Sequence, residues 1–132
     1  MTTSGTAAWP KTISAITLFT EDLATTRAFY QDVFGLPIAF EDPVSAVFMF
    51  GDTMVNLLQV SEAPELIAPA QVADPGAGAR FQFTIPVDDV DAMCEELRRR
   101  GVELLNGPMD RPWGIRTAAF RDPAGHVWEI AK

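Results

Sequence analysis

The chain has a single cysteine and a single histidine among its 132 residues, and it has no long apolar run. One cysteine cannot form an intrachain disulfide, which fits a reducing cytoplasm. No stretch approaches the ~18 consecutive apolar residues that a membrane-spanning helix needs. Residues 1–8 lack the basic and apolar regions of a secretory leader. We therefore expect a cytoplasmic protein with no membrane partner.

Basic residues are also scarce, since 10 Lys and Arg stand against 18 Asp and Glu, for a net charge of −8. Affinity for nucleic acid comes largely from Lys and Arg that neutralise phosphates, so nucleic acid is not an expected partner. The acidic balance favours a cationic or neutral ligand. The hydrophobic content of 48% and the length predict a globular chain that forms one domain over residues 1–132.

The sequence contains two similar halves, which we call modules. In each module an alternating, strand-like run leads to an acidic pair that begins a helix, and the helix ends at a glycine. Module one, residues 12–60, has this pattern at 13–20 and 21–35, with further strands near 37–41, 45–50 and 54–60. Module two, residues 80–131, has it at 81–87 and 88–101, with strands near 103–106, 117–120 and 127–131. Residues 61–79, rich in Ala, Pro and Gly, are predicted to be a linker.

The last hairpin carries the most informative motif. Residues 122–125, Asp-Pro-Ala-Gly, predict a tight turn, because proline presets φ at the second position and glycine suits the fourth. The strand after the turn places Glu129 among apolar residues. A buried carboxylate without a partner is costly, so Glu129 either faces water or lines a polar site. His126 is expected to be an exposed turn residue on the opposite face.

Alternation along the predicted strands separates an apolar face from a mixed face. The mixed face contains Ala15, Phe19, Asn56, Gln82 and Glu129. Partly polar side chains on one face are typical of a pocket in which a few groups orient a ligand. An ordinary sheet with one face in water is the alternative.

Several aromatic residues are candidates for the same pocket. Trp113 follows a proline and precedes a glycine in a predicted loop, where it either stacks on a planar or cationic ligand or packs over the pocket. Phe48 and Phe19 are further candidates for the pocket wall. The helical spacing around Tyr30 predicts core packing, and Cys94 is expected to be a small buried hydrophobic residue.

The order of the two modules and three short motifs together resemble the vicinal oxygen chelate superfamily. The motifs are the helix exit from Tyr30 to Gly35-Leu36, the segment Pro112-Trp113-Gly114 and the ending Asp-Pro-x-Gly-His-x-Trp-Glu. That superfamily includes glyoxalase I, bleomycin-resistance proteins and extradiol dioxygenases, and the resemblance covers roughly residues 12–131. It implies an α+β fold of two tandem βαβββ modules that form a curved, open barrel around a ligand. It also implies a homodimer, in which the Trp9-Pro10 segment would reach the partner.

The resemblance also places the positions that hold metal in metal-dependent members, one on each of four inner strands. They fall at Ala15, Asn56, Gln82 and Glu129. Only the carboxylate is a standard ligand, because alanine has no donor and neutral amides bind transition metals weakly. Ferrous dioxygenases need two histidines, and this chain has one. No glycine-rich phosphate loop is present either, so we expect neither a metal nor another cofactor.

The leading hypothesis is metal-independent binding or sequestration of a small, partly aromatic or cationic molecule, as in bleomycin-resistance-like members. Glu129 would be the charged anchor, Asn56 and Gln82 the orienting amides, and Trp113 with Phe48 the stacking walls. Two alternatives remain open. One is a lyase or isomerase of the glyoxalase type, which uses an unusually ligated metal or Glu129 alone for acid–base chemistry. The other is a non-catalytic module whose groove binds a protein.

Overall fold

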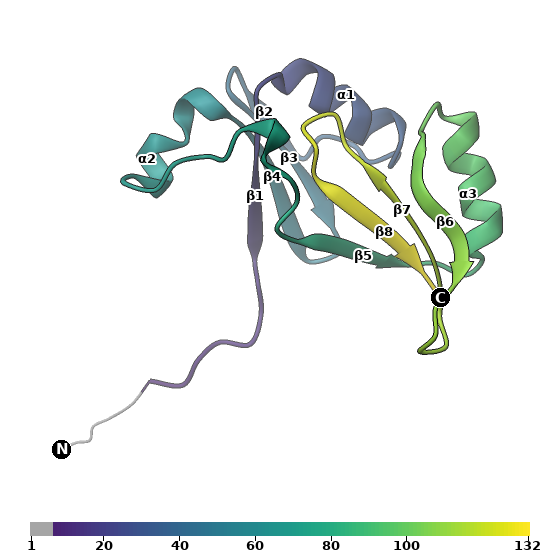
Figure 1. Ribbon diagram of the computed structural model, residues 1–132. Helices are drawn as coiled ribbons and strands as arrows, with labels where there is room; N and C mark the ends of the chain where they lie inside the picture. Colours follow the sequence, from purple (N-terminus) through teal and green to yellow (C-terminus); the bar gives the residue numbers. More distant parts are fainter. Residues whose placement is uncertain (1–6) are drawn as a thin grey trace.

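A computed structural model describes residues 7–132 as two four-stranded sheets with helices, an α+β fold (Figure 1). The first module comprises β1 (Ala15–Thr20), α1 (Leu23–Asp32), β2 (Phe40–Asp42), β3 (Ser45–Phe50) and β4 (Thr53–Gln59). The second comprises β5 (Gln82–Pro86), α3 (Val90–Arg99), β6 (Leu104–Asp110), β7 (Arg116–Arg121) and β8 (Val127–Ala131). The predicted tandem βαβββ order is thereby confirmed. Residues 1–6, part of the stretch inspected for a leader, lie outside the described residues.

The segment between the modules is more ordered than its composition predicted. It contains two 3₁₀ turns, Val60–Glu62 and Pro75–Ala77, on either side of the short helix α2 (Pro64–Ile67). Pro64 begins α2 and Pro75 begins the second 3₁₀ turn, where proline's fixed φ is already helical and its missing N–H is not needed. Over residues 7–132, no helix is long and apolar enough to cross a membrane.

The two sheets have the same topology. Their strand orders are β1-β4-β3-β2 and β5-β8-β7-β6, with one parallel pair in each, β1 with β4 and β5 with β8. In both sheets the helices and the strand residues of the hydrophobic core lie on one face. We call the opposite face the open face. Its members include Ala15, Thr17, Phe19, Met49, Met54 and Asn56 in the first sheet, and Gln82, Thr84, Asn106, Ala119 and Glu129 in the second.

The helix-side faces of the two sheets share one hydrophobic core. Tyr30 of α1 and Phe34, which follows the end of this helix, contact the Trp128 ring of β8, with centroids 6.1 and 4.9 Å apart, and Phe50 of β3 stacks on the same tryptophan at 5.0 Å. Cys94 of α3 is fully buried in this core, as predicted. Since both sheets turn their helix sides inward, their open faces point away from the core, and the curved sheets do not close into a barrel within one chain.

Both long helices begin where the acidic pairs predicted. Asp22 caps α1 by accepting from the Thr25 N–H at 3.2 Å, and Asp89 caps α3 by accepting from the Ala92 N–H at 3.0 Å. Such caps satisfy backbone donors that the first helical turn leaves free. The Gln59 side chain also accepts from the Leu23 N–H at 3.1 Å, which ties the start of α1 to β4.

Strand β6 is longer than predicted because it continues through an irregularity. The register of β6 with β7 shifts between Asn106 and Met109. Gly107 at this point has φ +84°, and a Cβ there would lie 2.4 Å from the Thr117 carbonyl oxygen. Only glycine therefore fits, and the strand predicted near 103–106 runs on to Asp110.

Candidate functional site

The polar residues predicted for a pocket lie on the open faces, as alternation indicated. Asn56 on β4 lies opposite Thr17 of β1, and Glu129 on β8 lies opposite Thr84 of β5. Gln82, the first residue of β5, shares its face with Glu129. Asn56 thus belongs to the first sheet, whereas Gln82 and Glu129 belong to the second. Because the two open faces point away from a shared core, a single chain presents them as two separate surfaces.

Glu129 has one hydrogen-bonding partner that fixes its carboxylate. Thr84 Oγ1 donates to Glu129 Oε1 at 2.8 Å, and the Glu129 residue is half-buried. Among residues 7–132, no ion pair joins Glu129 to a lysine, arginine or histidine. The carboxylate is therefore positioned by a neutral hydroxyl, and no cationic side chain among the described residues pairs with it.

The open face of the first sheet is mainly apolar. Met49 and Met54 lie opposite each other on β3 and β4 and are 39% and 37% exposed. Ala15 and the half-buried Phe19 of β1 line the same face. Methionine is flexible and polarisable and packs well against aromatic groups. This face can supply an adaptable apolar wall but few directional contacts.

Phe48 does not line this face, which corrects the prediction. Its side chain is fully buried on the helix side, with its ring centroid 5.6 Å from that of Tyr30. Phe48 is paired with Val55, so Val47 and Met49 are its neighbours on the open face. The sequence of β3 is too uniformly apolar for alternation to indicate which residues face inward.

Trp113 occupies the exposed loop between β6 and β7, as predicted, and its side chain is 69% exposed. The Arg111 guanidinium lies 6.0 Å from the Trp113 ring centroid, and Arg111 Nε donates to Thr117 Oγ1 at 2.8 Å. Arg111 Nη2 also donates to Asn106 Oδ1 at 3.3 Å. Sequence reasoning missed Arg111 and Asn106. The arginine beside Pro112-Trp113 could have been noticed, but the direction of Asn106 depends on the irregularity in β6.

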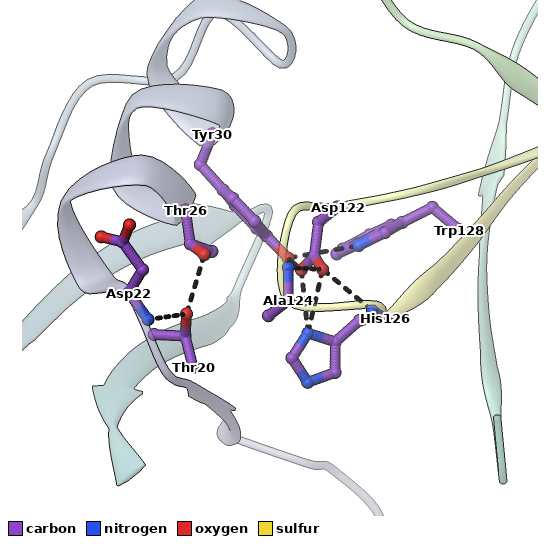
Figure 2. A network of polar contacts seen from close by, with 8 residues as sticks. All are labelled: Thr20, Asp22, Thr26, Tyr30, Asp122, Ala124, His126 and Trp128. Atoms are coloured by element: carbon purple, nitrogen blue, oxygen red, sulfur yellow. Dashed lines mark hydrogen bonds and ion pairs between the residues drawn. The ribbon is translucent and has the colours of Figure 1, made fainter. Parts of the chain in front are cut away.

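A buried polar network joins the β7–β8 turn to α1 (Figure 2). Asp122 Oδ2 accepts from the Tyr30 hydroxyl at 2.8 Å, and Trp128 Nε1 donates to the Tyr30 oxygen at 3.2 Å. Asp122 Oδ1 accepts from the backbone N–H groups of Ala124 and His126 at 3.0 and 2.9 Å. Burial, reinforced by the nearby Asp122 carboxylate, raises the pKa of Tyr30 far above its ordinary value. Tyr30 is therefore held as a neutral donor.

His126 belongs to this network, which corrects its prediction as an exposed turn residue. Its Nδ1 lies 2.9 Å from Asp122 Oδ2, and its side chain is only 16% exposed. The buried carboxylate draws the ring inward, an effect that the alternation of the strand could not reveal. His126 is then unavailable on the open face that carries Glu129.

The residues do not fit the transition-metal site of metal-dependent superfamily members. Ala15 offers no donor, and Asn56 is on a different sheet from Gln82 and Glu129. Within the described part of the chain, no group of three His, Cys, Asp or Glu side chains is placed to hold a metal. Glu129 alone would supply one strong ligand, which is fewer than such sites use.

A separate groove of about 760 Å³ lies on the helix side, between the end of α1 and α3. Its floor is apolar, and charged side chains from α3 and the turn before it form its rim. The lining residues include Phe34, Leu36, Phe50, Met93, Leu97 and Arg100. Neither Asn56, Gln82 nor Glu129 lines this groove.

This fold and its open faces define a glyoxalase-like class of protein, and comparison with known proteins agrees. The chain belongs to the Glyoxalase/Bleomycin resistance protein/Dioxygenase superfamily, whose family model matches residues 12–130. The uncharacterized protein YraH of Bacillus subtilis is 34% identical over 121 residues, which cover 89% of this chain and 94% of YraH.

Two solved structures support the same assignment. A glyoxalase/bleomycin resistance protein/dioxygenase from Nocardioides superposes with a TM-score of 0.84 at 27% identity, covering 96% of this chain and 85% of that one. Lactoylglutathione lyase from Agrobacterium tumefaciens superposes with a TM-score of 0.74 at 27% identity, covering 92% of this chain and 93% of the lyase chain. The superfamily resemblance and the predicted fold are thereby confirmed.

Proposed function

We propose that this protein binds a small, partly aromatic cation in the cytoplasm without the help of a metal. The observation that carries the proposal is Glu129, a half-buried carboxylate fixed by Thr84 and left without a cationic partner in the described chain. A carboxylate in a partly desolvated site attracts a cation more strongly than one in water. The net charge of −8 would further draw cations toward the site.

The remaining open-face residues suit the other parts of such a ligand. Gln82 and Asn56 would orient the polar atoms of the ligand, and the exposed ring of Trp113 would stack on its aromatic group. Ala15 and Phe19 would add small and aromatic surface to the wall. Bleomycin-resistance-like members of the superfamily, which sequester a toxic compound, are the closest functional type for this arrangement.

The proposed groove is completed by a second copy of the chain. One open face is mainly apolar and the other carries Glu129, so pairing them would enclose a ligand between an apolar wall and a polar wall. The segment before β1 runs away from the body as an extended arm, with Trp9 88% and Ile13 69% exposed (Figure 1). Apolar surface of this kind supports a contact with a partner.

A thermal-shift screen with matched compound pairs tests the proposal. Each pair shares one aromatic ring and differs in a single group, a quaternary ammonium in one compound and a tert-butyl group in the other. Binding to the folded state raises the melting temperature. The cationic members should raise it more than their neutral partners, because only the cation gains from Glu129. A screen in which neutral members stabilise equally would contradict a charged anchor.

A lyase of the glyoxalase type is the second candidate, and the likeness to lactoylglutathione lyase from Agrobacterium tumefaciens supports it. Elemental analysis of protein purified without chelators separates the two candidates. We expect substoichiometric transition metal and no glyoxalase or ring-cleavage turnover after zinc, nickel, manganese or ferrous iron is added. Near-stoichiometric metal that is lost in Glu129→Ala would favour the lyase.

A further inference from the structure

The Asp122–His126 pair leaves one histidine nitrogen free to accept a hydrogen bond. An ionised carboxylate only accepts, so the His126 Nδ1 that lies 2.9 Å from Asp122 Oδ2 carries the proton. In the neutral ring Nε2 is then an acceptor. Figure 2 shows this second nitrogen on the side of the ring away from Asp122. Among the described residues, no side chain or backbone group is hydrogen-bonded to Nε2.

His126 lines a cavity of about 240 Å³ between the β7–β8 turn, the end of β1 and the linker. Phe19 and Phe81 line it as well, and the Phe81 ring centroid lies 6.3 Å from that of His126. Ile67 and Val72 of the linker add further apolar surface. The cavity thus combines aromatic walls with the free acceptor nitrogen of His126, and Glu129 does not line it.

We propose that this cavity binds a small neutral phenol or a similar aromatic hydroxy compound. The ligand hydroxyl donates to His126 Nε2, and its ring lies against Phe19 and Phe81. Asp122 holds the imidazole in the accepting tautomer, and the Tyr30 hydroxyl and two backbone N–H groups hold Asp122. His126 is therefore fixed in its orientation before the ligand arrives, which lowers the entropic cost of binding.

Size and charge narrow the ligand class. A volume of about 240 Å³ is below the usual range for drug-sized ligands, so a single ring is the expected size. Two carboxylate residues, Glu21 and Asp74, and one cationic residue, Arg80, line the cavity. The excess negative charge disfavours a phenolate, so the ligand keeps its proton and donates it to His126.

The probe is 4-methylphenol, and 4-methylanisole, in which a methyl group replaces the hydroxyl proton, is the matched ligand. His126 is the chain's sole histidine, so its ring signals in an NMR spectrum report on this cavity without ambiguity. The titration is run at pH 8. We expect 4-methylphenol to shift the ring signals saturably and to bind about tenfold more tightly than 4-methylanisole, the usual effect of one hydrogen bond.

Two variants and one control separate the roles of the residues. By calorimetry, His126→Asn should abolish the preference for 4-methylphenol, because the shorter side chain removes the acceptor at Nε2. Phe81→Ala should weaken both ligands together while the His126 signals still report the preference. Phe40→Ala alters a phenylalanine of similar exposure on β2, outside the cavity, and should leave the affinities for both ligands unchanged.

Should His126→Asn fail to fold, Phe81→Ala and the ligand pair still decide the question. Equal affinities for the two ligands, no saturable shift, or an unchanged Phe81→Ala variant would each overturn the proposal.

Discussion

The side chain of Asp122 explains why the last turn and the first helix depend on each other. A buried carboxylate is tolerated when hydrogen bonds replace its lost water. Asp122 accepts hydrogen bonds from backbone N–H groups of its own turn and from the hydroxyl of Tyr30, which lies 92 positions away in the sequence. The turn was predictable from Asp-Pro-Ala-Gly, but the partner was not, because only the packing of α1 against β8 brings Tyr30 to the turn.

Tyr30 should resist ionisation for as long as the protein is folded. Burial raises its pKa above the value of about 10 expected in the unfolded chain. The stability that Tyr30 contributes is thus fully present below pH ~10 and is lost as the pH rises toward the folded-state pKa. Tyr30 is the chain's single tyrosine, so the ultraviolet absorbance of phenolate measures it alone.

We expect the phenolate signal to appear only together with the loss of the circular dichroism of the folded state. Tyr30→Phe should weaken the decline in stability above pH ~10, because the titrating group is gone. A phenolate signal near pH 10 in a protein that retains its native circular dichroism would contradict the buried network.

At the scale of the elements, local signals in the sequence located most boundaries. Asp22 and Asp89 mark the helix starts because capping is a local interaction, and β3 and β8 match the predicted ranges. The face of Phe48 was mispredicted because a uniformly apolar strand carries no alternation. The course of β6 was missed because its irregularity depends on close contact with β7.

Gly107→Ala tests that contact. A Cβ at Gly107 would lie 2.4 Å from the Thr117 carbonyl oxygen and 2.7 Å from the Ala118 Cα, and the backbone φ of +84° disfavours any side chain. Backbone atoms in a paired strand can move away from a new Cβ only by distorting the strand pairing. We therefore expect the free energy of unfolding to fall by about 2–4 kcal/mol. Chemical denaturation measures it. Gly51→Ala is the matched control, since Gly51 also has positive φ but meets no atom within 4 Å. Equal losses in the two variants would mean that the close contact is absent.

At the scale of the whole molecule, the residues of the two open faces could be predicted from the sequence, but the orientation of the two faces relative to each other could not. Alternation identified Asn56, Gln82 and Glu129 as members of one kind of face. It could not show that a shared core turns the two sheets back to back, because that depends on the aromatic contacts between modules around Trp128.

We expect the chain to form a homodimer through these faces. Multi-angle light scattering at micromolar concentration should give twice the 14.4 kDa chain mass. Met54→Lys should shift the protein toward monomer, because it places an unpaired charge on the apolar open face. Leu66→Lys alters an exposed leucine on α2, outside both sheets, and should remain dimeric. A wild-type monomer mass would contradict the expected assembly.

The charge of Glu129 is tested most directly by calorimetry on chelator-treated protein. A cationic aromatic compound from the screen and its neutral partner are each titrated into the wild type and into Glu129→Gln, which keeps the shape of the side chain and removes its charge. A charge-assisted contact contributes about 1.5–3 kcal/mol, so the cation should bind ten- to hundredfold more weakly to Glu129→Gln. The affinity of the neutral compound should hardly change. Equal affinities of the wild type and Glu129→Gln for the cation, or loss of wild-type binding after chelation, would contradict a metal-independent site anchored by Glu129.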